Sequence, residues 1–239
     1  MFGMKHASRK PFLDEAEKPF WISFSDLMTA LMVLFLVAMA VALMAVTQGL
    51  NRMEAAKKDR EETVNACITD LRSIADRPEF KGVVVRDHSI EFGTLAEFDK
   101  NGHDLTPERK RFLRVFVPLV LDVARHPSCD KWLKRVVVEG FASQEGSYLY
   151  NLNLSFFRSQ RVLCVLLDSN ASDAPSLEDR KTIRTLFLAG GSSFNAVKKR
   201  PEESRRVELK LEFHELGKDR ETLPEIPWDE DSKCPSDAK

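Results

Sequence analysis

The chain has 239 residues, enough for one modest domain with additional segments. It carries 36 Lys and Arg residues against 37 Asp and Glu residues, and this balance excludes the basic excess that is typical of nucleic-acid-binding proteins. The mean hydropathy of −0.29 averages one very apolar segment with a strongly charged remainder, so we infer the protein class segment by segment.

An apolar run without charges extends from Leu27 to Val46. As a helix it would be about 30 Å long, which is the thickness of a bilayer core. The run is too long for the apolar region of a signal peptide, and the residues after it do not resemble a cleavage site. We therefore predict a polar arm over 1–19 and a transmembrane helix over 20–48. Lys and Arg residues flank the run on both sides, so the positive-inside rule does not decide its orientation.

The segment after the apolar run, residues 49–81, combines helical periodicity with alternating charge, which predicts a short, solvated helical stalk. Pairing of this stalk with a second copy stays open, because its apolar seam is short. A folded domain is predicted over 82–215. The acidic, proline-bearing segment 216–239 is predicted to be a flexible tail.

The predicted domain alternates strands with helices. Strand-like patterns cover 82–92, 133–142, 182–191 and 204–215, and helical patterns cover 105–127 and 152–169. Thr106 is a suitable N-cap for the first of these helices, and Pro107 lies in its first turn. This order predicts an α/β sandwich, in which one sheet carries helices on one face. The expected fold class is therefore α+β, with a single transmembrane helix and a short helical stalk before the sandwich.

The sequence lacks the common enzyme motifs. It contains no phosphate-binding glycine loop, dinucleotide-binding fingerprint, nucleophile elbow or zinc-protease motif, and its five histidines are scattered. We therefore predict that the chain is not an enzyme and that it binds no cofactor and no metal ion.

The four cysteines form no CxxC pair and no cluster with histidine, which argues against a zinc site. Their even number permits disulfides if the domain is exported, but the pairing stays open. Cys67, at the end of the predicted stalk, could link two copies, pair within the chain or remain free. The candidate disulfide residues are Cys67, Cys129, Cys164 and Cys234.

One carboxylate, Asp26, lies just inside the first edge of the predicted transmembrane helix. It has a structural explanation, since an acidic residue in the first turn of a helix is favoured by the helix dipole by roughly 0.3–1 kcal/mol. It also has a functional one. Asp26 shares a helical stripe of small or polar residues with Thr29, Ala30 and Val33, the kind of face that packs against other helices. Ionisable residues within a membrane mark ion pathways, so Asp26 is our candidate ion carrier.

The stretch "PFWISFSDLMTALMVLFLV" resembles the single transmembrane helix of MotB-type stator subunits. The matching residues, in the same order, are Trp21, Phe24, Asp26, Met28, Thr29, Ala30, Leu31 and Met32. The resemblance implies that Asp26 carries ions, with Thr29, Ala30 and Val33 lining the pore or packing against a partner. It also implies two copies of this chain inside a ring of multi-span A subunits. The N-terminus would then be cytoplasmic in a bacterial inner membrane, with the C-terminal domain in the periplasm.

A second region, "GFASQEGSYLYNLNLSFFRSQRV", resembles the OmpA-like peptidoglycan-binding domain, as do "FDKNGHDLTPE" before it and "ESRRVEL" near its end. In that family an Asp and an Arg hold the diaminopimelate of peptidoglycan. Arg158 occupies the Arg place, whereas Ser143 stands where the Asp is usual. Glu145 is one candidate to replace the missing contact, and Asn151 has an alternative explanation as a helix cap. The candidate peptidoglycan-binding residues are Ser143, Tyr150, Asn151, Leu152 and Arg158.

The short segment between helix and domain differs from the long linker of flagellar stators. In this respect, and in its tail, the chain more closely resembles the B-subunit family of the Zorya anti-phage defence system. The resemblance implies an ion-driven motor subunit anchored to peptidoglycan, without direct contact to nucleic acid. Two alternatives stay open: a flagellar stator subunit, and a passive peptidoglycan tether that transports no ion. The sequence does not decide between protons and sodium ions.

Overall fold

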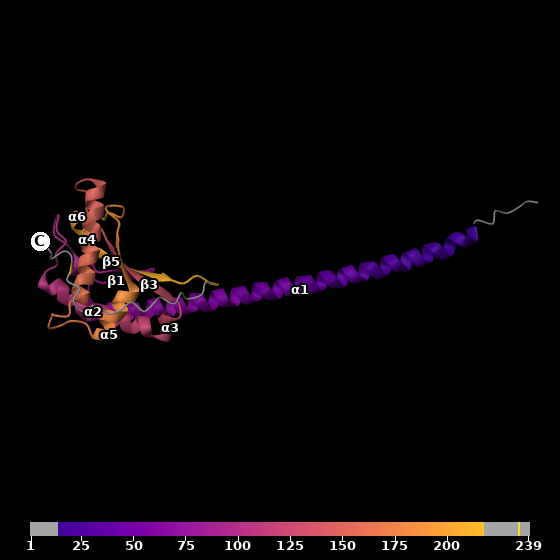
Figure 1. Ribbon diagram of the computed structural model, residues 1–239, viewed down its shortest axis with the longest axis horizontal. Helices are drawn as coiled ribbons and strands as arrows, with labels where there is room; N and C mark the ends of the chain where they lie inside the picture. Colours follow the sequence, from indigo (N-terminus) through magenta and orange to yellow (C-terminus); the bar gives the residue numbers. More distant parts are fainter. Residues whose placement is uncertain (1–13, 218–233, 235–239) are drawn as a thin grey trace, which may run out of the picture. The chain divides into compact units, whose positions relative to one another are not determined.

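The computed structural model describes residues 14–217 and Cys234, so most of the predicted N-terminal arm and of the predicted tail lie outside the described residues. The chain divides into two units, Met1–Ala56 and Lys57–Lys239. Figure 1 shows both units and labels the α-helices and some of the strands.

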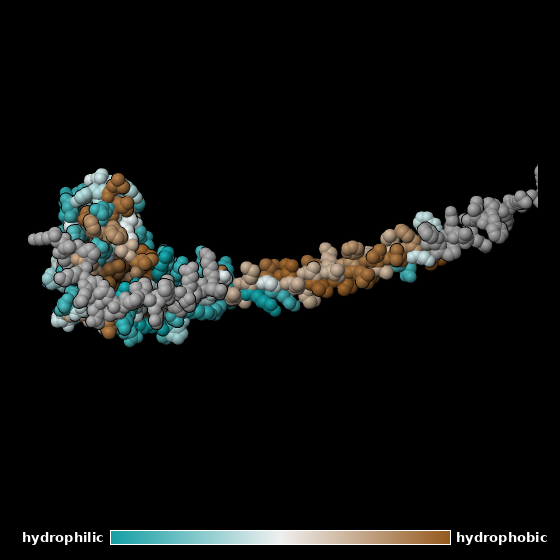
Figure 2. All heavy atoms as spheres, in the orientation of Figure 1, coloured by the Kyte–Doolittle hydropathy of each residue, from teal (hydrophilic) through white to brown (hydrophobic). Residues whose placement is uncertain are grey.

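In the first unit the described residues form one helix, α1 (Asp14–Ala75), which continues without a break into the second unit. All side chains from Trp21 to Ala56 are exposed, and Figure 2 shows the apolar ones as a brown band along the helix. Within the described residues, α1 is the one helix long and apolar enough to cross a membrane, and none of its most apolar window is buried. The predicted transmembrane segment, 20–48, lies within it.

The second unit contains a five-stranded sheet in the order β1-β2-β5-β3-β4. Strands β3 and β4 are parallel, and the other neighbours are antiparallel. The strands are β1 (Val84–Arg86), β2 (Ser89–Glu91), β3 (Leu133–Gly140), β4 (Phe187–Gly191) and β5 (Val207–Phe213). The main helices are α2 (Pro107–Arg125), α4 (Tyr148–Leu167) and α5 (Leu177–Leu186), and the short ones are η1 (Pro78–Phe80), η2 (Gly93–Ala96), α3 (Pro127–Asp130) and α6 (Pro201–Ser204).

The helices cover one face of the sheet, which confirms the predicted α/β sandwich. Val136 and Val138 of the central strand β3 are completely buried, whereas Arg135 and Glu139, on the opposite face, are half-buried. This alternation is expected when only one face of a strand is covered. Helix α4 packs against β3 and β4, and α5 also contacts both strands.

Local sequence signals explain where the main helices begin. Thr106 accepts a hydrogen bond from the backbone N–H of Arg109 at 3.4 Å, so it is the predicted N-cap of α2. Helix α2 continues through Pro118. Helix α4 begins in the same manner, because Ser147 accepts from the N–H of Tyr150 at 3.3 Å.

Two of the predicted strands were wrong in part. The segment 182–191 becomes a strand only from Phe187, because Ser176 caps a helix by accepting from the N–H of Asp179 at 3.0 Å. The segment 82–92 is a hairpin rather than one strand. Its turn is at Asp87, which has a φ of 48°, a left-handed conformation that Asp tolerates.

The end of α1 is part of the core of the second unit. The sequence predicted a solvated stalk, and residues 57–62 have largely exposed side chains. Beyond them one face of the helix is buried, because its apolar residues recur every three or four positions. The buried residues of this face are Val64, Cys67, Ile68, Leu71, Ile74 and Ala75.

Candidate functional site

The first candidate site is the face of α1 around Asp26. This residue carries the one charge in the sequence between Lys18 and Arg52. The hydroxyl of Thr29 donates to the backbone oxygen of Ser25 at 2.7 Å. Among the residues that the structure describes, none forms an ion pair or a hydrogen bond with the Asp26 side chain.

The neighbours of Asp26 on α1 leave its face open. Ala30 is exposed, and Val33 exposes 53% of its surface. Trp21 and Phe24 meet edge to face, with ring centroids 6.4 Å apart, one turn before the carboxylate. A carboxylate on an apolar helix without a counter-charge needs water, a proton or a partner from another chain to stabilise it.

The second candidate site surrounds Arg158, in the middle of α4. Its side chain is completely buried. Three backbone oxygens accept hydrogen bonds from its guanidinium: that of Gly102 from Nε at 2.9 Å, that of Phe141 from Nη1 at 2.8 Å and that of Asp99 from Nη2 at 3.1 Å. The guanidinium carbon also lies 5.4 Å from the ring centroid of Phe98. Arg158 therefore fastens the loop Asp99–Gly102 to the end of β3.

The charge of Arg158 is held in an unfavourable environment. Burial, and then repulsion by the nearby Arg205, lower the pKa of Arg158 to about 10. The group is still protonated at neutral pH. Within the described part of the chain no carboxylate forms an ion pair with it. Ser143, which the sequence resemblance predicts at the place of an Asp, supplies no charge.

The other predicted contact residues lie around the start of α4. Ser143 is buried, and Asn151 is buried with its amide nitrogen donating to the backbone oxygens of Glu145 at 2.8 Å and Ser147 at 3.1 Å. Asn151 thus stabilises the loop before the helix. Tyr150 is 48% exposed and Leu152 is half-buried. The Glu145 carboxylate forms an ion pair with Lys100 at 2.9 Å, which joins the two loops that border Arg158.

Two glycines set the close approach of α4 to the sheet. A Cβ atom at Gly140 would overlap the backbone carbonyl of Ser155, and one at Gly191 would lie 2.9 Å from the backbone nitrogen of Phe156. The glycines are paired across β3 and β4. Gly191 was not among the residues predicted from the sequence, although two consecutive glycines at the end of an apolar segment were a visible signal.

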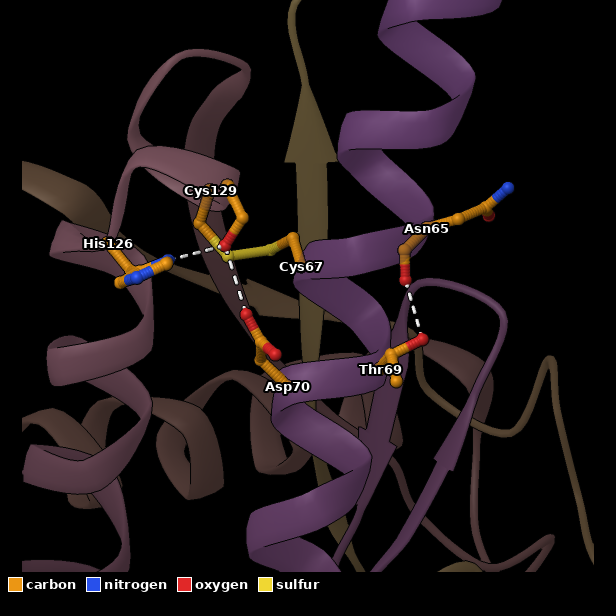
Figure 3. Close-up of a disulfide and its surroundings, with 7 residues drawn as sticks. Asn65, Cys67, Thr69, Asp70, His126 and Cys129 are labelled. Atoms are coloured by element: carbon orange, nitrogen blue, oxygen red, sulfur yellow. Dashed lines mark hydrogen bonds between the residues drawn. A yellow bond between two sulfur atoms is a disulfide. The ribbon is translucent and has the colours of Figure 1, made fainter.

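The four cysteines form two disulfides, Cys67–Cys129 and Cys164–Cys234. The first joins α1 to α3, and Figure 3 shows it beside Asp70 and His126. The second joins α4 to the C-terminal segment. The described residues contain no group of three or more His, Cys, Asp or Glu side chains that could hold a metal ion.

Comparison with solved structures finds several chains of weak similarity. The cell wall anchor of the type VI secretion system from Pseudomonas aeruginosa is 20% identical, with 61% of this chain and 97% of that chain covered and a TM-score of 0.39. A putative MotB-like protein from Desulfovibrio vulgaris is 17% identical, with 66% and 96% covered and a TM-score of 0.39. The OmpA-like domain of FopA1 from Francisella tularensis is 17% identical, with 56% and 82% covered and a TM-score of 0.36.

No protein-family model matches the chain. The Zorya protein ZorB of Escherichia coli O139:H28 (strain E24377A / ETEC) is 45% identical over 232 residues, which cover 95% of this chain and 94% of that protein. With this identity over nearly its full length, the chain belongs to the ZorB family of Zorya proteins.

Proposed function

We propose that this chain is the peptidoglycan-anchored B subunit of a stator-like, ion-driven complex in anti-phage defence, and that Asp26 carries the ion. The observation that carries the proposal is Asp26 itself, the one charge between Lys18 and Arg52 on an exposed apolar helix. Family membership and the resemblance of this helix to that of MotB-type subunits support the same role.

The energetics of ion carriage are adequate. Moving one elementary charge through 100 mV releases about 2.3 kcal/mol, enough to drive a change in helix packing. Protonation would remove the charge of Asp26 and so change its contact with a neighbouring protein. One helix cannot line a channel, so a multi-span A subunit has to supply the remaining wall. We propose that two copies of this chain lie inside a ring of such subunits.

The two disulfides support one orientation in the membrane. Disulfides form and persist in oxidising compartments such as the bacterial periplasm. All four cysteines lie in the second unit, beyond the apolar segment. We propose that this unit is periplasmic, that the N-terminus is cytoplasmic and that the chain crosses the inner membrane once.

The peptidoglycan contact would lie where α4 begins. Arg158 orders the loop Asp99–Gly102 through two of its three backbone hydrogen bonds, and three of its five N–H donors are used by protein. The exposed Tyr150 and the half-buried Leu152 would contact the wall beside this loop. Since Ser143 is neutral, we propose that the wall contact does not use the carboxylate–amine pair of OmpA-like domains that carry an Asp at this place.

Phage protection tests the ion-carrying role. Asp26→Asn keeps the shape of the side chain and removes its charge, so we expect cells that carry the complete defence locus to lose protection in a phage plating assay. Glu54→Gln, an equivalent change at an exposed carboxylate of α1 beyond the apolar segment, is the matched control and should protect normally. Full protection by an Asp26→Asn variant present at normal levels would favour the passive tether instead.

Sedimentation with isolated peptidoglycan tests the wall contact. Tyr150→Ala should reduce the bound fraction several-fold. Leu177→Ala removes a similarly exposed apolar side chain from α5 and should leave binding unchanged. Equal binding by both variants would show that the contact does not lie at the start of α4.

A further inference from the structure

The C-terminal part of α1, residues 59–75, is attached to the rest of the second unit at three successive levels. Nearest the N-terminal end, Lys131 forms an ion pair with Asp59 at 2.7 Å. Beside it, Arg60 donates from Nε to the backbone oxygen of His214 at 2.8 Å, and its guanidinium carbon lies 5.8 Å from the centre of the Trp132 ring. The side chains of Asp59 and Lys131 are more than half exposed, so their ion pair is weak.

The second level is the disulfide between Cys67 and Cys129, whose two residues are both buried. One turn further along α1, Asp70 accepts a hydrogen bond from the hydroxyl of Ser128 at 3.0 Å, and this hydroxyl lies 2.9 Å from Nδ1 of His126. Figure 3 shows Asp70 and His126 next to the disulfide. The third level is the apolar face that ends at Ile74 and Ala75. Only the disulfide is covalent.

The disulfide also determines on which strand of the sheet a force applied along α1 would first act. Cys129 lies in α3, four residues before Leu133, the first residue of β3. Strand β3 has partners on both edges, β5 and β4. Without the disulfide, the first strand reached along the chain would be β1, Val84–Arg86, which has three residues and only one partner, β2. An edge strand of this length can be peeled from its neighbour one hydrogen bond at a time, whereas β3 is held from both sides.

We propose that the Cys67–Cys129 disulfide is a force-bearing joint: it transfers tension from α1 directly to the central strand β3 and keeps the edge strand β1 unloaded. The proposal rests on the proposed anchoring to peptidoglycan, since an anchored subunit of a moving complex is pulled between wall and membrane. The non-covalent contacts around Asp59 and Arg60 then position the helix, and the disulfide carries the load.

Single-molecule pulling on the purified full-length chain tests the joint. One attachment point is the N-terminus, and the other is Leu149 at the start of α4, whose side chain is 73% exposed. Leu149 is chosen because the proposed wall contact lies in the same part of α4. Removal of the disulfide by Cys67→Ser with Cys129→Ser should lower the force of the first unfolding step at least two-fold. That step should release residues 68–91, roughly 80 Å of extended chain at about 3.4 Å per residue.

Two controls separate the joint from general destabilisation. Cys164→Ser with Cys234→Ser removes the other disulfide, which lies outside this path, and should leave the first step unchanged. Asp59→Ala removes only the ion pair and should also leave it unchanged. If removal of Cys67–Cys129 does not change the first step, or if Asp59→Ala lowers the force equally, the proposal is wrong.

A measurement without force distinguishes this proposal from the proposed wall anchoring. The variant without Cys67–Cys129 should sediment with isolated peptidoglycan as the wild type does, because no tension acts in that assay. If the wild type itself fails to sediment, the anchoring is wrong, whatever the pulling experiment gives. If only the variant fails, the disulfide maintains the binding surface at rest, and its role as a joint under tension is overturned.

Discussion

Residues 21–56 of α1 and the folded part of the second unit present their side chains in opposite ways. In the first segment every side chain is exposed, including Phe35 at 73%. In the second, apolar side chains from the strands, α2, α4, α5 and the end of α1 form one buried cluster. The second unit thus contains the contacts that fold it, whereas the apolar helix has surfaces that only lipid or another chain can cover.

This difference separates two kinds of mutational effect. A substitution in the folded unit should first change the stability of that unit. It should change wall binding only if it lowers this stability or lies on the contact surface. A substitution in the apolar segment should leave the unfolding of the domain unchanged and affect assembly or ion passage. The following predictions test this separation, beginning with the largest expected effect on folding.

Gly140→Ala should destabilise the folded unit most. The added Cβ would overlap the backbone of Ser155, so α4 would have to move away from the sheet. We expect the free energy of unfolding to fall by about 3 kcal/mol or more. Urea unfolding followed by circular dichroism measures this change. Gly49→Ala is the matched control in α1, since nothing lies within 4 Å of the added Cβ, and it should have no such effect.

Arg158→Ala should cause the second-largest loss in the free energy of unfolding. It leaves three backbone carbonyls without their donor, those of Asp99, Gly102 and Phe141, and we expect a loss of about 2–3 kcal/mol. Thermal unfolding measures the loss, with Arg111→Ala on the exposed side of α2 as control. An unchanged Tm, together with lost peptidoglycan binding, would show that Arg158 is a ligand contact and not a structural one.

Lys131→Gln should have a small effect. Its ion pair with Asp59 is exposed, and such pairs contribute less than about 1 kcal/mol. The difference from the wild type should vanish in 1 M salt, because salt screens exposed charges. A loss that persists at high salt would mean that the packing of Lys131 on Trp132, at 5.3 Å from the ring centroid, is the more important contact.

Phe35→Ala should have no measurable effect on the unfolding of the domain. Its side chain lies on the exposed apolar segment of α1 and is not part of the buried cluster. Calorimetry of the detergent-solubilised chain should give the wild-type Tm for the domain. A shift of several degrees would show that the exposed apolar segment contributes to the stability of the folded unit.

Much of the fold follows from local signals in the sequence. Thr106 and Pro107 mark the start of α2, and the alternating pattern of 204–215 contains β5. The error at 182–186 arose because apolar residues there favour a strand, while the cap formed by Ser176 and Asp179 lies six residues upstream. Tertiary packing of Ile183 against the core then stabilises the helix.

Other features could not be predicted because they depend on which distant segments meet. Four cysteines allow three pairings, and periodicity does not choose among them. The burial of Arg158 depends on the loop at Asp99, 59 residues away in the chain. The buried face of α1 beyond Val64 was visible as an apolar repeat, but its partner surface was not. The role of Asp26 differs again, since its proposed partners belong to another chain.

Ion flux through the reconstituted complex is the most direct test of the central claim, that Asp26 carries the ion. The chain, co-purified with the proposed multi-span A subunit, would be placed in liposomes under an imposed membrane potential, and proton and sodium fluxes would be recorded separately. The wild type and Glu54→Gln should conduct one of these ions, whereas Asp26→Asn should reduce that flux to the level of protein-free liposomes. An Asp26→Asn complex of unchanged composition that conducts at the wild-type rate would contradict the claim.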